Sequence, residues 1–134
     1  AHPDALVIGA DQILHLEGAW FDKPRDLAEA RTHLIRLRGR THELVGATVI
    51  RRGETRVWHR VTRARLTMRP FTDAFLDDYL AAVGDDVLAS VGGYQLEGRG
   101  AQLFEAVDGD YFTILGLDLL PVLDVLRNHG VLIP

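Results

Sequence analysis

Unbroken apolar runs, and runs that alternate apolar with polar residues, predict the strands of this chain. Residues 5–10 are all apolar or glycine, which is typical of a central strand that a sheet buries on both faces. Residues 13–16 either continue this strand or form the next one. Segments 41–52 and 54–68 are rich in β-branched residues and flank Gly53, so we expect two long strands joined by a hairpin turn.

Apolar residues three and four positions apart predict three helices, each with a start signal. Asp26 and Glu29 resemble a capping box, and Thr72 and Asp118 stand where N-cap residues of the other two helices are expected. The three predicted helices cover residues 26–38, 73–83 and 119–128.

The segment between the second and third helices is rich in glycine, with the sequence SVGGYQLEGRG over residues 90–100. Glycines at this density form turns and β-bulges, or they let the backbone approach a ligand closely, and the sequence favours neither explanation. The segment matches neither a P-loop nor the dinucleotide fingerprint. Residues 101–107 and 111–115 are then predicted as two short strands joined by the hairpin dipeptide Asp108-Gly109.

Composition places the chain among ordinary globular proteins and excludes several classes of function. Its 134 residues, 47% hydrophobic and 25% charged, fit a single domain over 1–134. A net charge of −4 argues against a nucleic acid polymer as partner, although local cations can still bind a small anion. No apolar run approaches the roughly 20 residues that a membrane span needs, so no membrane partner is expected. Without cysteine, neither disulfides nor thiolate metal sites can form.

Few side chains remain that could perform covalent catalysis or bind zinc. Ser90 is the only serine and lies in no nucleophile motif. No two histidines have zinc-ligand spacing, and we expect His15, His42 and His59 to be hydrogen-bonded structural residues.

An acidic and a basic residue follow the first predicted strand. Asp11 and Gln12 end the apolar run, and Lys23, the only lysine, returns one loop later. Together with Glu97 they form a set of oxygen ligands and one cation. Such a set suits Mg²⁺ and the attack of an activated water on a phosphate.

The order of several short motifs resembles the Maf family of nucleoside triphosphate pyrophosphatases. In order they are IGADQ, DKP, a helix ending in LRGRTHE, a strand closing near residues 62–66, GGYQLEGRGAQLF and DGDYFTILGL, and the resemblance runs from about residue 6 to residue 130. It implies an α/β fold, a mixed elongated sheet with flanking helices, related to inosine triphosphate pyrophosphatases.

The resemblance also implies an activity and roles for individual residues. Family members hydrolyse nucleoside triphosphates to monophosphate and pyrophosphate with a divalent metal, Mg²⁺ or Mn²⁺. Asp11 would activate water and contact the metal, Lys23 would contact phosphate, and Gln12 and Glu97 would select the base. Gln12 and Glu97 look more like the branch linked to 7-methyl-GTP than the branch acting on dTTP and UTP. A cytoplasmic homodimer is expected.

Two departures from the family pattern open alternatives. The Ser-x-Ser-Pro-Arg-Arg phosphate loop is absent, so we expect residues 1–134 to be the C-terminal part of a Maf-like domain, without its N-terminal strand–helix unit and weak or inactive alone. Gly116-Leu117-Asp118 replaces the usual Gly-Leu-Pro. The alternative function is a non-catalytic regulator of cell division that binds a nucleotide or a partner, and a further possibility is a fragment that folds only as a dimer.

Overall fold

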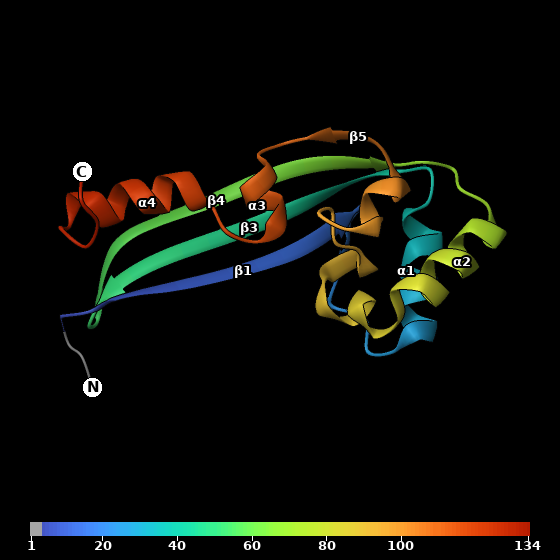
Figure 1. Ribbon diagram of the computed structural model, residues 1–134, viewed down its shortest axis with the longest axis horizontal. Coiled ribbons are helices and arrows are strands. Elements are labelled where there is room, and N and C mark those ends of the chain that lie inside the picture. The colour runs from blue at the N-terminus through green and yellow to red at the C-terminus, as the bar shows by residue number, and fades with distance from the viewer. Residues whose placement is uncertain (1–3) are drawn as a thin grey trace.

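The computed structural model describes residues 4–134 and shows one long, twisted sheet with helices at both ends (Figure 1). The strand order is β2-β1-β3-β4-β5, and all four pairings are antiparallel. The α/β class and the elongated sheet with flanking helices are therefore confirmed, with antiparallel pairs where the resemblance implied a mixed sheet. The strands are β1 (Leu6–Leu16), β2 (Ala19–Phe21), β3 (Thr41–Arg52), β4 (Thr55–Met68) and β5 (Phe104–Asp108).

The central hairpin of β3 and β4 forms where the sequence predicts it. Gly53 lies between the two strands with a φ of +59°, a backbone conformation that glycine adopts without strain. The register pairs Ile50 with Trp58 and Leu44 with Ala64. A bulge between Ile50 and Arg51 is the one irregularity near the turn.

Strand β1 is more exposed than the continuous apolar run predicts. Val7 is 61% exposed and Ile8 is 41% exposed, whereas Leu14 and Leu16 at the other end are buried. The prediction of a strand buried on both faces is therefore wrong for residues 5–10. The reason is that β2 pairs with β1 only over its last three residues, and the helices of the main core cover only that end.

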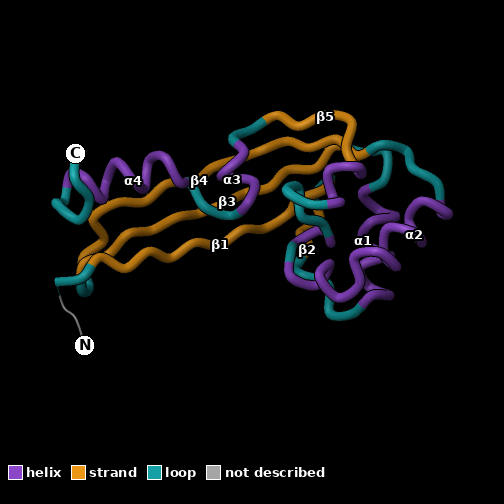
Figure 2. The backbone as a smooth tube through the Cα atoms, viewed as in Figure 1, coloured by secondary structure: helices purple, strands orange, loops and turns teal. Residues whose placement is uncertain are grey.

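The main core lies at the end of the sheet where most helices gather (Figure 2). Helices α1 (Leu27–Leu37) and α2 (Asp73–Val83), followed by short 3₁₀ turns over residues 84–103, pack there. A second, smaller cluster lies under α4 (Leu119–Asn128), beside the other end of β4. Fully buried side chains of the main core include Leu14, Leu34, Leu37, Leu66, Leu76 and Leu103.

The three helices begin where the sequence predicts, but the hydrogen bonds at their N-caps differ from one helix to the next. The Asp26 carboxylate accepts a hydrogen bond from the Glu29 N–H at 2.8 Å, while the Glu29 side chain accepts from the Arg25 N–H. Thr72 Oγ1 accepts from the Phe75 N–H at 3.1 Å. Asp118 precedes α4 without a side-chain cap bond.

Of the last two predicted strands, the one over residues 101–107 forms in part, as β5, and the one over residues 111–115 is wrong. Residues 111–115 form the short helix α3 (Tyr111–Leu115) instead of a strand. The Asp110 carboxylate caps this helix by accepting hydrogen bonds from the Thr113 N–H at 2.9 Å and the Thr113 hydroxyl at 3.0 Å. The dipeptide Asp108-Gly109 therefore leads into a helix and not into a hairpin, and β5 begins only at Phe104, after a 3₁₀ turn.

Buried polar contacts fix the glycine-rich segment against the core. His42 Nε2 and the Tyr94 hydroxyl are 2.8 Å apart, and the Tyr79 hydroxyl donates to the Gly93 carbonyl at 2.9 Å. Burial lowers the pKa of His42 to about 4 and raises the pKa of Tyr79 to about 12, so both side chains are neutral near pH 7. His42 is thus the hydrogen-bonded structural residue that the sequence suggests.

Gly92 leaves no room for a side chain. Its φ is +82°, and a Cβ there would lie 2.6 Å from the Tyr94 ring and 2.8 Å from the Leu14 side chain. Glycine is therefore required at this position for both backbone and packing reasons.

We expect Gly92→Ala to lower the free energy of unfolding by about 2–4 kcal/mol, because positive φ and overpacking add. Gly18→Ala is the matched control: its φ of +87° is close to that of Gly92, but nothing lies within 4 Å of the added Cβ, so only the backbone strain of about 1–2 kcal/mol applies. Urea denaturation of both variants measures the difference. Equal losses would contradict the packing argument.

The stability of the protein should fall as the pH is lowered from 6.5 toward 4. In that range an unfolded His42 binds a proton and the folded one does not, so folding loses about 2–3 kcal/mol from this residue. His42→Gln should be less stable than the wild type at pH 7, and the gap should narrow by pH 4.5. Denaturation at several pH values measures this. A constant gap would refute it.

Candidate active site

The antiparallel pairing of β2 with β1 brings Lys23 close to Asp11. Phe21 pairs with Leu14, and the chain continues beyond Phe21 in the direction that runs back along β1. Lys23, two residues later, therefore reaches the level of Gln12. All three sequence-predicted residues Asp11, Gln12 and Lys23 line one cavity of about 220 Å³. Its other lining residues are Ala10, Ala89, Ser90, Val91, Leu115 and Gly116.

Asp11 and Gln12 lie on opposite faces of β1, because successive side chains of a strand alternate. Asp11 is exposed, and its Oδ1 accepts a hydrogen bond from the Gln12 backbone N–H at 2.8 Å. Within the described part of the chain this is the one hydrogen bond to the carboxylate. The carboxylate therefore keeps an oxygen accessible to water or a cation, as a general base or a metal ligand requires.

Gln12 is turned toward helix α3. Its Nε2 donates to the backbone carbonyls of Thr113 and Ile114, each at 3.1 Å. Both amide hydrogens are therefore used, and only the Oε1 acceptor remains to meet a ligand. The sequence could not place α3 here, because it predicted a strand over residues 111–115.

Glu97 lines a neighbouring, smaller cavity of about 40 Å³ and not the cavity of Asp11. The two cavities share Gln12, Ser90 and Val91, together with Leu115 of α3. Gln12 therefore lines both the cavity of Asp11 and that of Glu97. Tyr94, fixed by His42, lines the Glu97 side, so the buried polar contacts of the core also support this site.

Ser90 is the residue of this site that sequence reasoning missed as a ligand candidate. It is the only serine of the chain and lines both cavities. Its place at the start of the glycine-rich segment was the available signal. Its hydroxyl can both donate and accept a hydrogen bond, which suits contact with a sugar or a phosphate.

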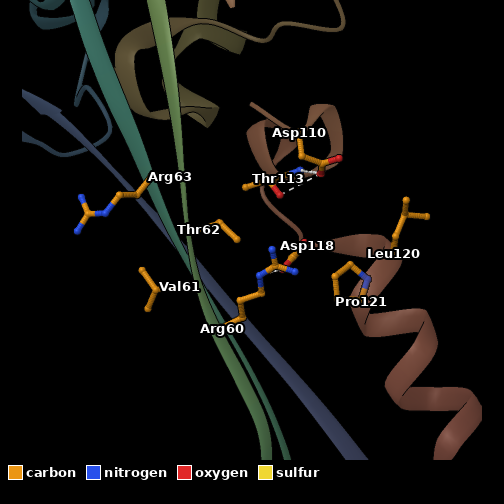
Figure 3. A pocket seen from close by; sticks show the side chains of 9 residues that line it. All are labelled: Arg60, Val61, Thr62, Arg63, Asp110, Thr113, Asp118, Leu120 and Pro121. Carbon is orange, nitrogen blue, oxygen red and sulfur yellow. Dashed lines mark hydrogen bonds and ion pairs between the residues drawn. The ribbon is translucent and has the colours of Figure 1, made fainter. Parts of the chain in front are cut away.

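A larger cavity, about 530 Å³, lies between β4 and the helices α3 and α4 and contains none of the predicted site residues. Figure 3 shows Arg60 pointing toward Asp118 across it, whereas Arg63 and Val61 point away. Arg60 Nε lies 3.3 Å from Asp118 Oδ2, and the Asp118 side chain is 6% exposed. This ion pair explains why Asp118 provides no helix cap: its carboxylate ties α4 to the sheet.

Comparisons with known proteins identify the family. A family model described as Maf-like protein matches residues 1–129. The chain is 56% identical over 133 residues to a nucleoside triphosphate pyrophosphatase of Rhodospirillum rubrum, covering 99% of this chain and 66% of that protein. It is 53% identical over 129 residues to a 7-methyl-GTP pyrophosphatase of Rhizobium meliloti, covering 96% of this chain and 65% of that protein.

The chain spans about two thirds of the length of these curated relatives. No helix among residues 4–134 is long and apolar enough to cross a membrane. The matched residues 1–129 include the segments from IGADQ to DGDYFTILGL. The chain therefore belongs to the Maf-like protein family.

Proposed function

We propose that the protein hydrolyses nucleoside triphosphates to a nucleoside monophosphate and pyrophosphate. The observation on which this rests is the cavity that Asp11 and Lys23 both line. Relatives that are 53–56% identical to this chain over the aligned residues are named as pyrophosphatases of nucleoside triphosphates and of 7-methyl-GTP. The names and the cavity support the same chemistry.

In the proposed reaction Asp11 acts as the general base. Its accessible oxygen takes a proton from a water molecule, and the water oxygen attacks the α-phosphorus. The bond between that phosphorus and the bridging oxygen breaks, and pyrophosphate leaves. Lys23 contacts the phosphates and offsets their negative charge, which in phosphoryl transfer is most of the protein's task.

A divalent metal, Mg²⁺ or Mn²⁺, is part of the proposal. No group of three or more His, Asp or Glu side chains gathers within residues 4–134, so these residues do not form a closed metal cage. A single accessible carboxylate does fit Mg²⁺, which binds through one or two carboxylates and the substrate phosphates and keeps several waters. Asp11 would hold the ion, which when bound neutralises phosphate charge.

An acceptor group at Glu97 supports a base that offers hydrogen-bond donors. The carboxylate of Glu97 can accept two such bonds, whereas the Nε2 of Gln12 is bonded to α3, so we place base selection mainly on Glu97. Guanine has adjacent N–H donors on its pairing edge, whereas uracil and thymine offer one. We therefore infer a preference for guanine-type bases, including 7-methylguanine, over dTTP and UTP.

A nucleotide-binding regulator of cell division without turnover is the second candidate. The described lining residues of the Asp11 cavity supply one cation, Lys23, against the several negative charges of a triphosphate. A cytoplasmic location follows if the substrate is a free nucleotide. A homodimer also belongs to the proposal, because β1 and β4 expose apolar side chains such as Val7 and Val61 of the kind that subunit interfaces bury.

Asp11→Asn should lower kcat about 10²–10⁴-fold in the full-length protein with Mg²⁺, because an amide cannot accept the proton of the attacking water. Pyrophosphate release from a panel of nucleotides measures this. The matched control is Asp86→Asn, an exposed carboxylate that does not line the cavity, and it should keep wild-type activity. If Asp11→Asn turns over substrate as fast as the wild type, Asp11 is not the general base. Nucleotide binding without product in the wild type would favour the regulator.

Glu97→Gln should reduce the preference for guanine-type nucleotides over UTP by about 10–100-fold in kcat/KM, because the amide replaces one acceptor oxygen by a donor. The ratio of kcat/KM for GTP, 7-methyl-GTP and UTP measures it. Glu105→Gln, an exposed residue of β5, is the control and should leave the ratio unchanged. If Glu97→Gln also leaves the ratio unchanged, Glu97 does not select the base.

A further inference from the structure

We propose that Gln12 acts as a positioning residue: it holds helix α3 in place as one wall of the two cavities. This inference rests on the proposed function for its catalytic consequences, but the contacts that support it are independent of any substrate. It gives Gln12 a different role from direct recognition of the base by its amide group.

The contacts of Gln12 with α3 use its whole donor group. Its Nε2 donates hydrogen bonds to the carbonyl oxygens of Thr113 and Ile114, each at an N···O distance of 3.1 Å. These residues lie about a hundred positions further along the sequence. These carbonyls belong to the last turn of α3, where backbone donors further along the chain are few. The Thr113 carbonyl accepts from the Gly116 N–H as well, so Gln12 adds a second donor there and supplies the donor for the Ile114 carbonyl from a different element, strand β1.

Helix α3 needs such support because it is short. It has five residues, and an isolated helix of that length is unstable in water. Its start is fixed by the Asp110 carboxylate, which accepts from the N–H and the hydroxyl of Thr113. Its end is fixed by Gln12. Thr113 donates two hydrogen bonds to Asp110 and accepts one from Gln12, so the two anchors meet on the same residue.

The supported helix end forms the cavity wall. Leu115 and Gly116, which follow the carbonyls bound by Gln12, line the Asp11 cavity, and Ile114 and Leu115 line the Glu97 cavity. Gly116 ends the helix with a φ of +119°, so the backbone turns sharply next to Asp11. If the wall moves, both cavities change together, whichever base is bound.

This arrangement makes a prediction that direct base recognition does not. Removing the donors of Gln12 should lower kcat/KM for all nucleotides by a similar factor. Loosening α3 at its other end, at Asp110, should do the same. If Gln12 recognised the base directly, Gln12→Leu would instead change the ratio of kcat/KM between nucleotides, and an Asp110 variant would not change it.

The test compares Gln12→Leu, Asp110→Ala and the double variant in the full-length protein. We expect each single change to lower kcat/KM for GTP, 7-methyl-GTP and UTP by a similar factor, about 5- to 50-fold, keeping the ratios within about threefold. The double variant should lose less than the product of the two factors, because both act on the same helix. Gln102→Leu, at an exposed glutamine, is the control for the chemical change.

Amide hydrogen exchange provides a readout that needs no activity. The Gly116 and Leu117 N–H groups donate to carbonyls of Thr113 and Phe112, and they should exchange about 5- to 50-fold faster in Gln12→Leu and Asp110→Ala. Unchanged exchange, or a base ratio altered more than tenfold by Gln12→Leu alone, would overturn the inference. If the two variants exchange faster and the wild-type protein releases no pyrophosphate, the positioning role is supported and the proposed function is refuted.

Discussion

The register between β1 and β3 determines the geometry of the whole site. Asp11 pairs with Ala47 and Gln12 with Gly46, so Asp11 and Gln12 are directed to opposite faces of the sheet. A slip of one residue would exchange these faces. The register is fixed by the far end of β1, where Leu14 pairs with Leu44 and both side chains are buried in the main core. Hydrophobic burial at one end of the strand therefore positions the polar chemistry at its middle.

The wall opposite β1 is built from segments with little regular structure, and buried polar contacts keep it in place. Tyr79, Tyr94 and His42 fix the glycine-rich segment, while Asp110 and Gln12 fix α3. Such contacts are costly to break because each would leave a buried polar group unpaired. Glycines allow the close packing, and hydrogen bonds then restrict the freedom that glycines would otherwise leave. The wall can thus be well positioned without a long helix or strand.

The sequence predicts the elements that local pattern determines and fails where distant contacts decide. The long hairpin of β3 and β4 and the helices after Asp26 and Thr72 follow from periodicity and capping, and they are confirmed. The exposure of Val7 could not be predicted, because it depends on which strand pairs with the edge of β1 and not on the residues of β1 themselves.

The site shows the same division between local and distant information. The spacing of Asp11, Gln12 and Lys23 around a tight β-hairpin makes their proximity predictable, and the motif order indicates the family. Helix α3 was missed because its five residues have strand-like composition, and the deciding contact is the Asp110 cap. The tie from Gln12 to Thr113 joins residues about a hundred positions apart, and no local pattern contains that information.

The distribution of cations supports a site that relies on Lys23. Most fixed cations of the chain are arginines, and several lie in surface ion pairs: Arg25 with Glu29, Arg38 with Asp73 and Arg40 with Glu17. Lys23 forms no ion pair within residues 4–134 and lines the Asp11 cavity. An ammonium group on a flexible stem can follow a phosphate as its charge is redistributed, whereas an arginine fixed to a carboxylate cannot. One such cation offsets only part of a triphosphate's charge. A divalent ion held at the Asp11 carboxylate would offset more of that charge.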